Sequence, residues 1–192
     1  METPPVARQE VRPLGRTEVR MPLKAARPHR LYALWLLLVS TGLCRGEALA
    51  LTWDDIGPDR RRLRVRRNLR RIKKEPVFGT PKTARSQRTI SLPRRCVDAL
   101  REHRAAQRTE RAVAGMKWDP LPYQPSGLVF TTPTGRPTDP RSLNRMLTVL
   151  CRTANVRRCG CTIAGTPASH SCRLKGWAPG PSWRRWVTAR SP

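Results

Sequence analysis

The densest apolar run in the chain covers residues 31–40 and breaks at Thr41-Gly42. A second, short helix is predicted directly after this break, with Glu47 in its first turn and apolar residues through Leu51 on one side. Two apolar helices that meet at a sharp glycine turn form a corner of the core. The residue just after the turn is therefore held in a fixed place.

Basic and apolar residues alternate between Leu63 and Leu69, which predicts a half-buried strand with a basic outer face. Two further short strands are predicted at 77–78 and 88–92, with the polar segment 81–86 as the turn between them. Together these segments predict a small three-stranded antiparallel sheet.

Three more helical segments complete the predicted elements. Residues 15–30 form a lead-in helix, Pro93 starts a helix that continues through Arg111, and residues 141–153 are amphipathic. Asp139 or Ser142 is the expected cap of the last helix. The fold class is therefore α+β and mainly α-helical, with a core built by residues 31–51, 96–104 and 143–150.

The charge balance points to a polyanionic partner. Lys and Arg number 39 against 13 Asp and Glu, a formal net charge of +26. This excess is far larger than solubility requires, and it favours nucleic acid over a membrane surface. The basic residues lie among apolar segments rather than in one tail, which favours a folded DNA or RNA binder over a ribosomal-type protein.

Several short motifs follow one another in a recognisable order. The set comprises Thr41-Gly42-Leu43 with Glu47, Leu51 to Ile56, Pro81-Lys82-Thr83, Arg88 to Pro93, and Val129-Phe130-Thr131. In this order and spacing the chain resembles the catalytic domain of the tyrosine recombinases, the phage-integrase family, from Arg12 to Arg158. The resemblance implies a partial and incomplete catalytic domain at 15–158. The polar, proline-containing start predicts a disordered arm or linker at 1–14, and the lack of helical or strand periodicity predicts a disordered tail at 159–192.

The resemblance also assigns candidate site residues. Cys44 stands where the family has its first catalytic Arg, and Arg45 is one residue out of register because Glu47 fixes the spacing. Lys82 matches the family Lys that protonates the departing 5′ oxygen of DNA; the alternative is a solvated turn lysine. Arg45, Arg85 and Arg88 would join Lys82 in contacting the phosphate backbone.

The family mechanism is metal-free, so the resemblance implies no cofactor. A tyrosine attacks the phosphodiester, and the family members assemble on double-stranded DNA as oligomers. The boxes that supply the second Arg, the His residues and this Tyr should follow residue 158, but none is present. Tyr32 lies on the apolar helix and Tyr123 in a Pro-rich loop, and neither matches the nucleophile.

A shifted reading frame after residue 158 permits two of the missing boxes, the one with the second Arg and the Gly-His box. We therefore hypothesise a one-base deletion near codon 159, which would make the tail an out-of-frame peptide. A zinc site remains as an alternative, since thiolates and an imidazole are suitable ligands, although their spacing matches no standard finger. Its ligands would be Cys159, Cys161, His170 and Cys172.

These observations predict a DNA-binding fragment of a site-specific tyrosine recombinase of the DNA integration and recombination lineage, without catalytic activity. The alternative is a non-catalytic basic nucleic-acid-binding protein with a genuine Cys/His tail. The first 30 residues lack an apolar signal segment, and residues 31–39 are too short to span a bilayer. We expect a cytoplasmic, nucleoid-associated protein with reduced thiols and no membrane partner.

Overall fold

The apolar run folds into helix α2 (Tyr32–Thr41), which is buried along most of its length. The computed structural model describes residues 16–80 and 87–156, with side chains from Arg20 onward. Helix α1 (Arg16–Ala25) precedes α2, and the short helix α3 (Arg45–Leu49) follows it. The predicted corner of two helices around Thr41-Gly42 is therefore confirmed.

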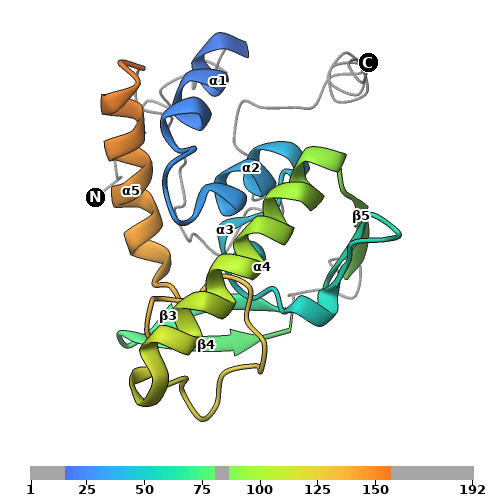
Figure 1. Cartoon of the computed structure of the whole chain (residues 1–192), viewed down its shortest axis with the longest axis vertical. Helices are drawn as coiled ribbons and strands as arrows, with labels where there is room; N and C mark the ends of the chain where they lie inside the picture. The colour runs from blue at the N-terminus through green and yellow to red at the C-terminus, as the bar shows by residue number, and fades with distance from the viewer. Residues whose placement is uncertain (1–15, 81–86, 157–192) are drawn as a thin grey trace, which may run out of the picture.

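Two long helices complete the helical part. Helix α4 (Arg94–Ala114) begins directly after Pro93 and extends three residues beyond Arg111, and helix α5 is Pro140–Thr153. Asp139 is the cap of α5, since its Oδ1 accepts a hydrogen bond from the Arg141 backbone N–H at 2.7 Å. Figure 1 places α4 across the front of α2 and α3, whereas α5 lies beside α1, against which it packs.

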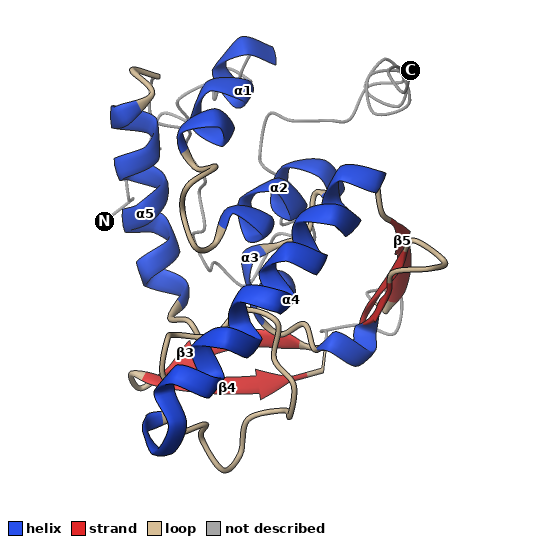
Figure 2. Cartoon of the chain, viewed as in Figure 1, coloured by secondary structure: helices blue, strands red, loops and turns tan. Residues whose placement is uncertain are grey.

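The strands form two small antiparallel sheets (Figure 2). Strands β1 (Ile56–Gly57), β2 (Arg62–Val65) and β5 (Arg88–Ser91) make one sheet in the order β1-β2-β5. Strands β3 (Asn68–Ile72) and β4 (Glu75–Gly79) make a separate hairpin. Short 3₁₀ turns lie at Trp53–Asp55 and Gly115–Lys117.

A small three-stranded antiparallel sheet is present, as predicted, but the strands that form it differ from the predicted ones. The single strand expected over 63–69 is divided into β2 and β3, and residues 77–78 pair with β3 rather than with β5. The division occurs at Arg66 and Arg67, whose guanidinium groups turn toward the buried carboxylate of Asp55. Because both side chains bind Asp55, the alternating pattern does not continue through them as one strand.

The predicted core segments 31–51, 96–104 and 143–150 all contribute almost fully buried side chains. Strand β2 and residues 128–130 also contribute to the core, which the sequence pattern did not predict. Residues 128–130 are a buried segment that bends rather than a regular strand, and isolated bridges pair Leu128 with Thr52 and Thr131 with Pro137. None of the helices in the described ranges combines the length and apolar character that crossing a bilayer requires.

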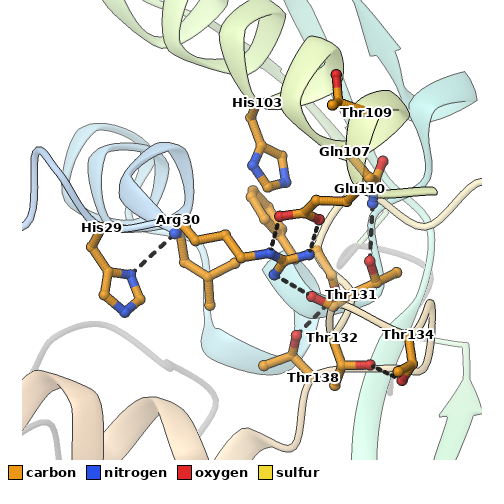
Figure 3. A network of polar contacts seen from close by, with 12 residues as sticks. His29, Arg30, His103, Gln107, Thr109, Glu110, Thr131, Thr132, Thr134 and Thr138 are labelled. Atoms are coloured by element: carbon orange, nitrogen blue, oxygen red, sulfur yellow. Dashed lines mark hydrogen bonds and ion pairs between the residues drawn. The ribbon is translucent and has the colours of Figure 1, made fainter. Parts of the chain in front are cut away.

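A polar network fastens α4 to this buried segment (Figure 3). Arg30 donates to both carboxylate oxygens of Glu110, at 2.5 and 2.6 Å, and to the Thr131 carbonyl at 2.6 Å. His103 Nε2 lies 2.8 Å from the Val129 carbonyl oxygen, and Gln107 donates to the carbonyls of Leu128 and Val129. Burial lowers the pKa of His103 and outweighs the hydrogen bond to the Val129 carbonyl, which raises it. The lowered pKa keeps the ring neutral near pH 7.

Candidate functional site

The turn between α2 and α3 fixes the position of Cys44. Gly42 adopts a left-handed conformation with φ of 67°, and its N–H donates to the Leu38 carbonyl at 3.1 Å. Thr41 Oγ1 donates to the Leu37 carbonyl at 2.7 Å and accepts from the Leu43 N–H at 3.3 Å. Cys44 follows as the N-cap residue of α3, and its side chain is half-buried.

Glu47 connects this turn to strand β5. Its Oε2 accepts a hydrogen bond from the Cys44 backbone N–H at 2.9 Å, as expected for the third residue of a helix. Both carboxylate oxygens also accept from Arg88, whose two terminal nitrogens lie 2.8 and 3.0 Å away. Cys44, Glu47 and Arg88 therefore form one cluster, although Glu47 and Arg88 are 41 residues apart in the sequence.

The cluster has a definite charge state. Burial raises the pKa of Glu47, but the hydrogen bonds from Arg88 and from the Cys44 N–H together outweigh it, and the net pKa is lowered. The same pairing raises the pKa of Arg88, chiefly through its hydrogen bond to Glu47. A deprotonated carboxylate and a charged guanidinium are consequently held together as a bidentate pair.

Protonation of Glu47 should weaken the fold in acid. Because the folded-state pKa is lowered, the pair contributes stability above the ordinary glutamate pKa and loses it as the pH falls below that value. The Glu47→Gln variant should therefore show a flatter decline of unfolding midpoint with acidification than the wild type, measured by urea titration at several pH values. The matched control is Glu102→Gln, which replaces an exposed glutamate. If the unfolding midpoints of the two variants fall equally steeply as the pH is lowered, Glu47 does not have this role.

Arg45 points to α5. Its Nη1 donates to the Pro140 carbonyl at 2.8 Å and to Asn144 Oδ1 at 3.1 Å. Arg71 from β3 binds the carboxylate of Asp139, the cap of the same helix. The first turn of α5 is therefore clamped against α3 and β3, next to the Cys44 cluster.

The structure places some predicted site residues together and leaves others untested. Cys44, Arg45 and Arg88 lie around the start of α3, whereas Lys82 and Arg85 fall outside the described residues. The four candidate zinc ligands from Cys159 to Cys172 also lie outside them. Within residues 16–80 and 87–156, no group of three or more His, Cys, Asp or Glu side chains is placed to hold a metal ion.

The role of Glu47 in the cluster was not predicted, since in the sequence Glu47 served only to fix the spacing after Gly42. Its position three residues after the helix cap could have indicated this role, because a glutamate there commonly accepts a hydrogen bond from the backbone N–H of the cap residue. Tyr32 packs partly buried against the core, as predicted. The hydroxyl of Tyr123 is exposed and lies 3.4 Å from a carboxylate oxygen of Glu75.

Comparison with known proteins identifies the lineage. The chain is 35% identical over 143 residues to a XerC-like tyrosine recombinase of Caldanaerobacter subterraneus subsp. tengcongensis, which covers 70% of this chain and 36% of that protein. It is 33% identical over 142 residues to an integrase of Streptomyces ambofaciens, and this alignment covers 69% of this chain and 34% of that integrase. The chain is a tyrosine-recombinase-like protein. No protein-family model matches it.

Solved structures agree on the fold of this recombinase-like chain. The Tn1549 transposon integrase, solved in complex with transposon right-end DNA, superposes with a TM-score of 0.66 at 19% identity, covering 78% of this chain and 47% of that one. The XerA recombinase gives a TM-score of 0.57 at 19% identity, covering 80% and 46%. The chain spans about a third of the length of the curated relatives named above (36% and 34%). The predicted fold class and family resemblance are both confirmed.

Proposed function

We propose that this recombinase-like chain binds double-stranded DNA through its basic surface and does not cleave it. The net charge of +26 supports binding to the phosphate backbone, which would be strongly salt-dependent. The Tn1549 integrase, which shares the fold, was solved with DNA, which favours the same class of partner here. Assembly into oligomers on DNA, which the resemblance implies for family members, is not part of this proposal.

Two features support the absence of cleavage: no tyrosine matches the family nucleophile, and position 44 is a cysteine. A cysteine at the cap of α3 offers one short thiol, whereas a guanidinium would reach farther and donate two parallel hydrogen bonds to a phosphate. Arg45 does not replace it, because its guanidinium is directed to the Pro140 carbonyl and Asn144. Arg88 is likewise engaged by Glu47. Charge stabilisation of a cleaved phosphate therefore lacks the group that the family resemblance places here.

Binding itself is tested by fluorescence-anisotropy titration of a labelled duplex between low and physiological salt. The proposal predicts that the logarithm of affinity falls linearly with the logarithm of salt concentration, with a steep slope. Affinity that does not change with salt, or an absence of binding at low salt, would contradict it.

Replacing Cys44 with arginine should strengthen binding without creating cleavage. One added phosphate contact is expected to raise affinity by up to about tenfold at low salt. The family nucleophile is a tyrosine, and Tyr32 and Tyr123 do not match its position, so no covalent intermediate is expected. Anisotropy measures the first effect and a denaturing gel the second, with Cys44→Ser as the control; a covalent adduct from the arginine variant would refute the proposal.

A further inference from the structure

The sheet β1-β2-β5 carries two arginines on the side that faces away from the core. In β2, Leu63 and Val65 are buried, so the alternating residues Arg62 and Arg64 project from the opposite side of the sheet. Both arginine side chains are exposed. The strand β5, which pairs with β2, lies at the right-hand edge of the molecule in Figure 2.

Strand β5 adds two hydroxyl groups beside these arginines. Ser91 lies opposite Arg62 in the ladder, and Thr89 lies opposite Arg64. Residues directly opposite in an antiparallel pair share one side of the sheet, with Cβ atoms about 5 Å apart, and alternate residues of one strand are about 7 Å apart. All four side chains are exposed and together form what we call the open sheet face: Arg62, Arg64, Thr89 and Ser91.

The structure separates the arginines of this basic segment into two groups. Arg66 and Arg67 bind the buried carboxylate of Asp55. By contrast, the side chains of Arg62 and Arg64 take part in no hydrogen bond or ion pair with any residue in the described ranges. Their charge and their hydrogen-bond donors are therefore available to a partner.

Positive charge continues into the turn before β2. Arg60 and Arg61 are exposed there, and the Leu92 N–H donates to the Arg61 carbonyl at 2.7 Å, which holds the turn against the end of β5. The acidic residue of the turn, Asp59, pairs with Arg101 of α4 at 3.7 Å. The surroundings of the open sheet face thus add to its positive charge.

The open sheet face and the candidate site are neighbours along one strand. Arg88, whose guanidinium binds Glu47, is the first residue of β5, and Thr89 is the next. Ser91 follows at about 10 Å from Arg88 along the strand. The two surfaces are therefore close in the structure, although their side chains project from opposite sides of β5.

We propose that the open sheet face binds the phosphate backbone of double-stranded DNA. The inference rests on the DNA binding proposed above and assigns it a surface, which Arg45 and Arg88 do not provide because their guanidinium groups are bound to protein acceptors. Each arginine fork donates paired hydrogen bonds to phosphate oxygens, and each hydroxyl donates one more. The fold shared with an integrase that was solved with DNA favours phosphate over carboxylate as the anion.

The first test removes the two charges. Anisotropy titration of a labelled duplex at several salt concentrations compares the full-length wild type with the double variant Arg62→Gln, Arg64→Gln. We expect affinity at low salt to fall at least tenfold and the salt slope to decrease by about 2. The control Lys24→Gln, Arg27→Gln removes the same charge from other exposed positions and should bind almost as the wild type does.

The second test separates direct phosphate contact from a loss of overall charge. The double variant Thr89→Val, Ser91→Ala removes two neutral donors, so its affinity should fall several-fold while its salt slope stays that of the wild type. Because all four replaced side chains are exposed, the unfolding midpoints in urea should match the wild type, which shows that each variant is folded.

An arginine variant that binds as tightly as the control, or a hydroxyl variant that binds as tightly as the wild type, would overturn the inference while leaving the proposed function intact. No binding by the wild type would overturn both. If the arginine variant loses more affinity for a polyglutamate peptide than for the duplex, the partner of the open sheet face is an acidic protein and the inference is wrong.

Discussion

Replacing Asp55 with alanine should lower the free energy of unfolding by about 3 kcal/mol, because it leaves several buried groups without their acceptor. The Asp55 side chain is 1% exposed, and its Oδ2 accepts hydrogen bonds from the Thr52 N–H at 3.1 Å and the Thr52 hydroxyl at 2.8 Å. The same oxygen lies 3.0 Å from Arg67 Nη2. The partial exposure of the Arg67 guanidinium keeps the effect at the low end for a broken buried pair.

The neighbouring Asp54→Ala variant is a matched control for this experiment. Asp54 is exposed in the same turn, so its replacement should change the free energy of unfolding by no more than about 0.5 kcal/mol. Urea titration followed by circular dichroism measures both. Equal destabilisation by the two variants would show that the Asp55 contacts do not hold the turn to β2 and β3.

The second large effect is expected at Gly46, where α3 lies against β3. A Cβ atom added at Gly46 would lie 1.9 Å from Asn68 Oδ1 and 2.6 Å from the Leu69 carbonyl oxygen. The amide of Asn68 can rotate away, but the backbone carbonyl of Leu69 moves only if the strand moves. Gly46→Ala should therefore destabilise the protein by about 2 to 3 kcal/mol, as overpacking does, and displace the Cys44 turn from β3.

Gly79→Ala provides the comparison, since a Cβ at Gly79 meets no atom within 4 Å. Its unfolding midpoint in urea should stay close to that of the wild type. The same samples should differ in DNA affinity, with Gly46→Ala weaker, because the start of α3 holds the candidate site. A Gly46→Ala protein as stable as Gly79→Ala would contradict the close approach of α3 to β3.

The helices and the core were predictable because each depends on a local pattern. The apolar run at 31–40, the glycine after it and the helical spacing of Leu143 and Leu150 all describe a helix and its buried face without reference to distant residues. The position of Cys44 followed from the same local break. These are features that periodicity and turn chemistry specify by themselves.

The strand pairing and the site contacts depend on distant partners and were not predictable in the same way. The alternation through 63–69 describes a strand, but it does not reveal that Arg66 and Arg67 turn to Asp55 and end it. The bond between Glu47 and Arg88 joins residues 41 positions apart, and that of Arg45 to Pro140 joins residues 95 apart. Composition predicted DNA as the partner but gave no sign that Arg45 and Arg88 would bind protein acceptors, the Pro140 carbonyl and the Glu47 carboxylate.

The central claim is that this recombinase-like chain binds duplex DNA without breaking it. One reaction tests it directly: the wild-type protein is incubated at low salt with an end-labelled duplex that carries a nick to trap any covalent intermediate. The sample is then divided between a native and a denaturing gel. The account predicts a retarded band on the native gel and only free DNA on the denaturing gel. A protein–DNA adduct that survives denaturation would contradict the proposed lack of cleavage, and free DNA on both gels would contradict the proposed binding.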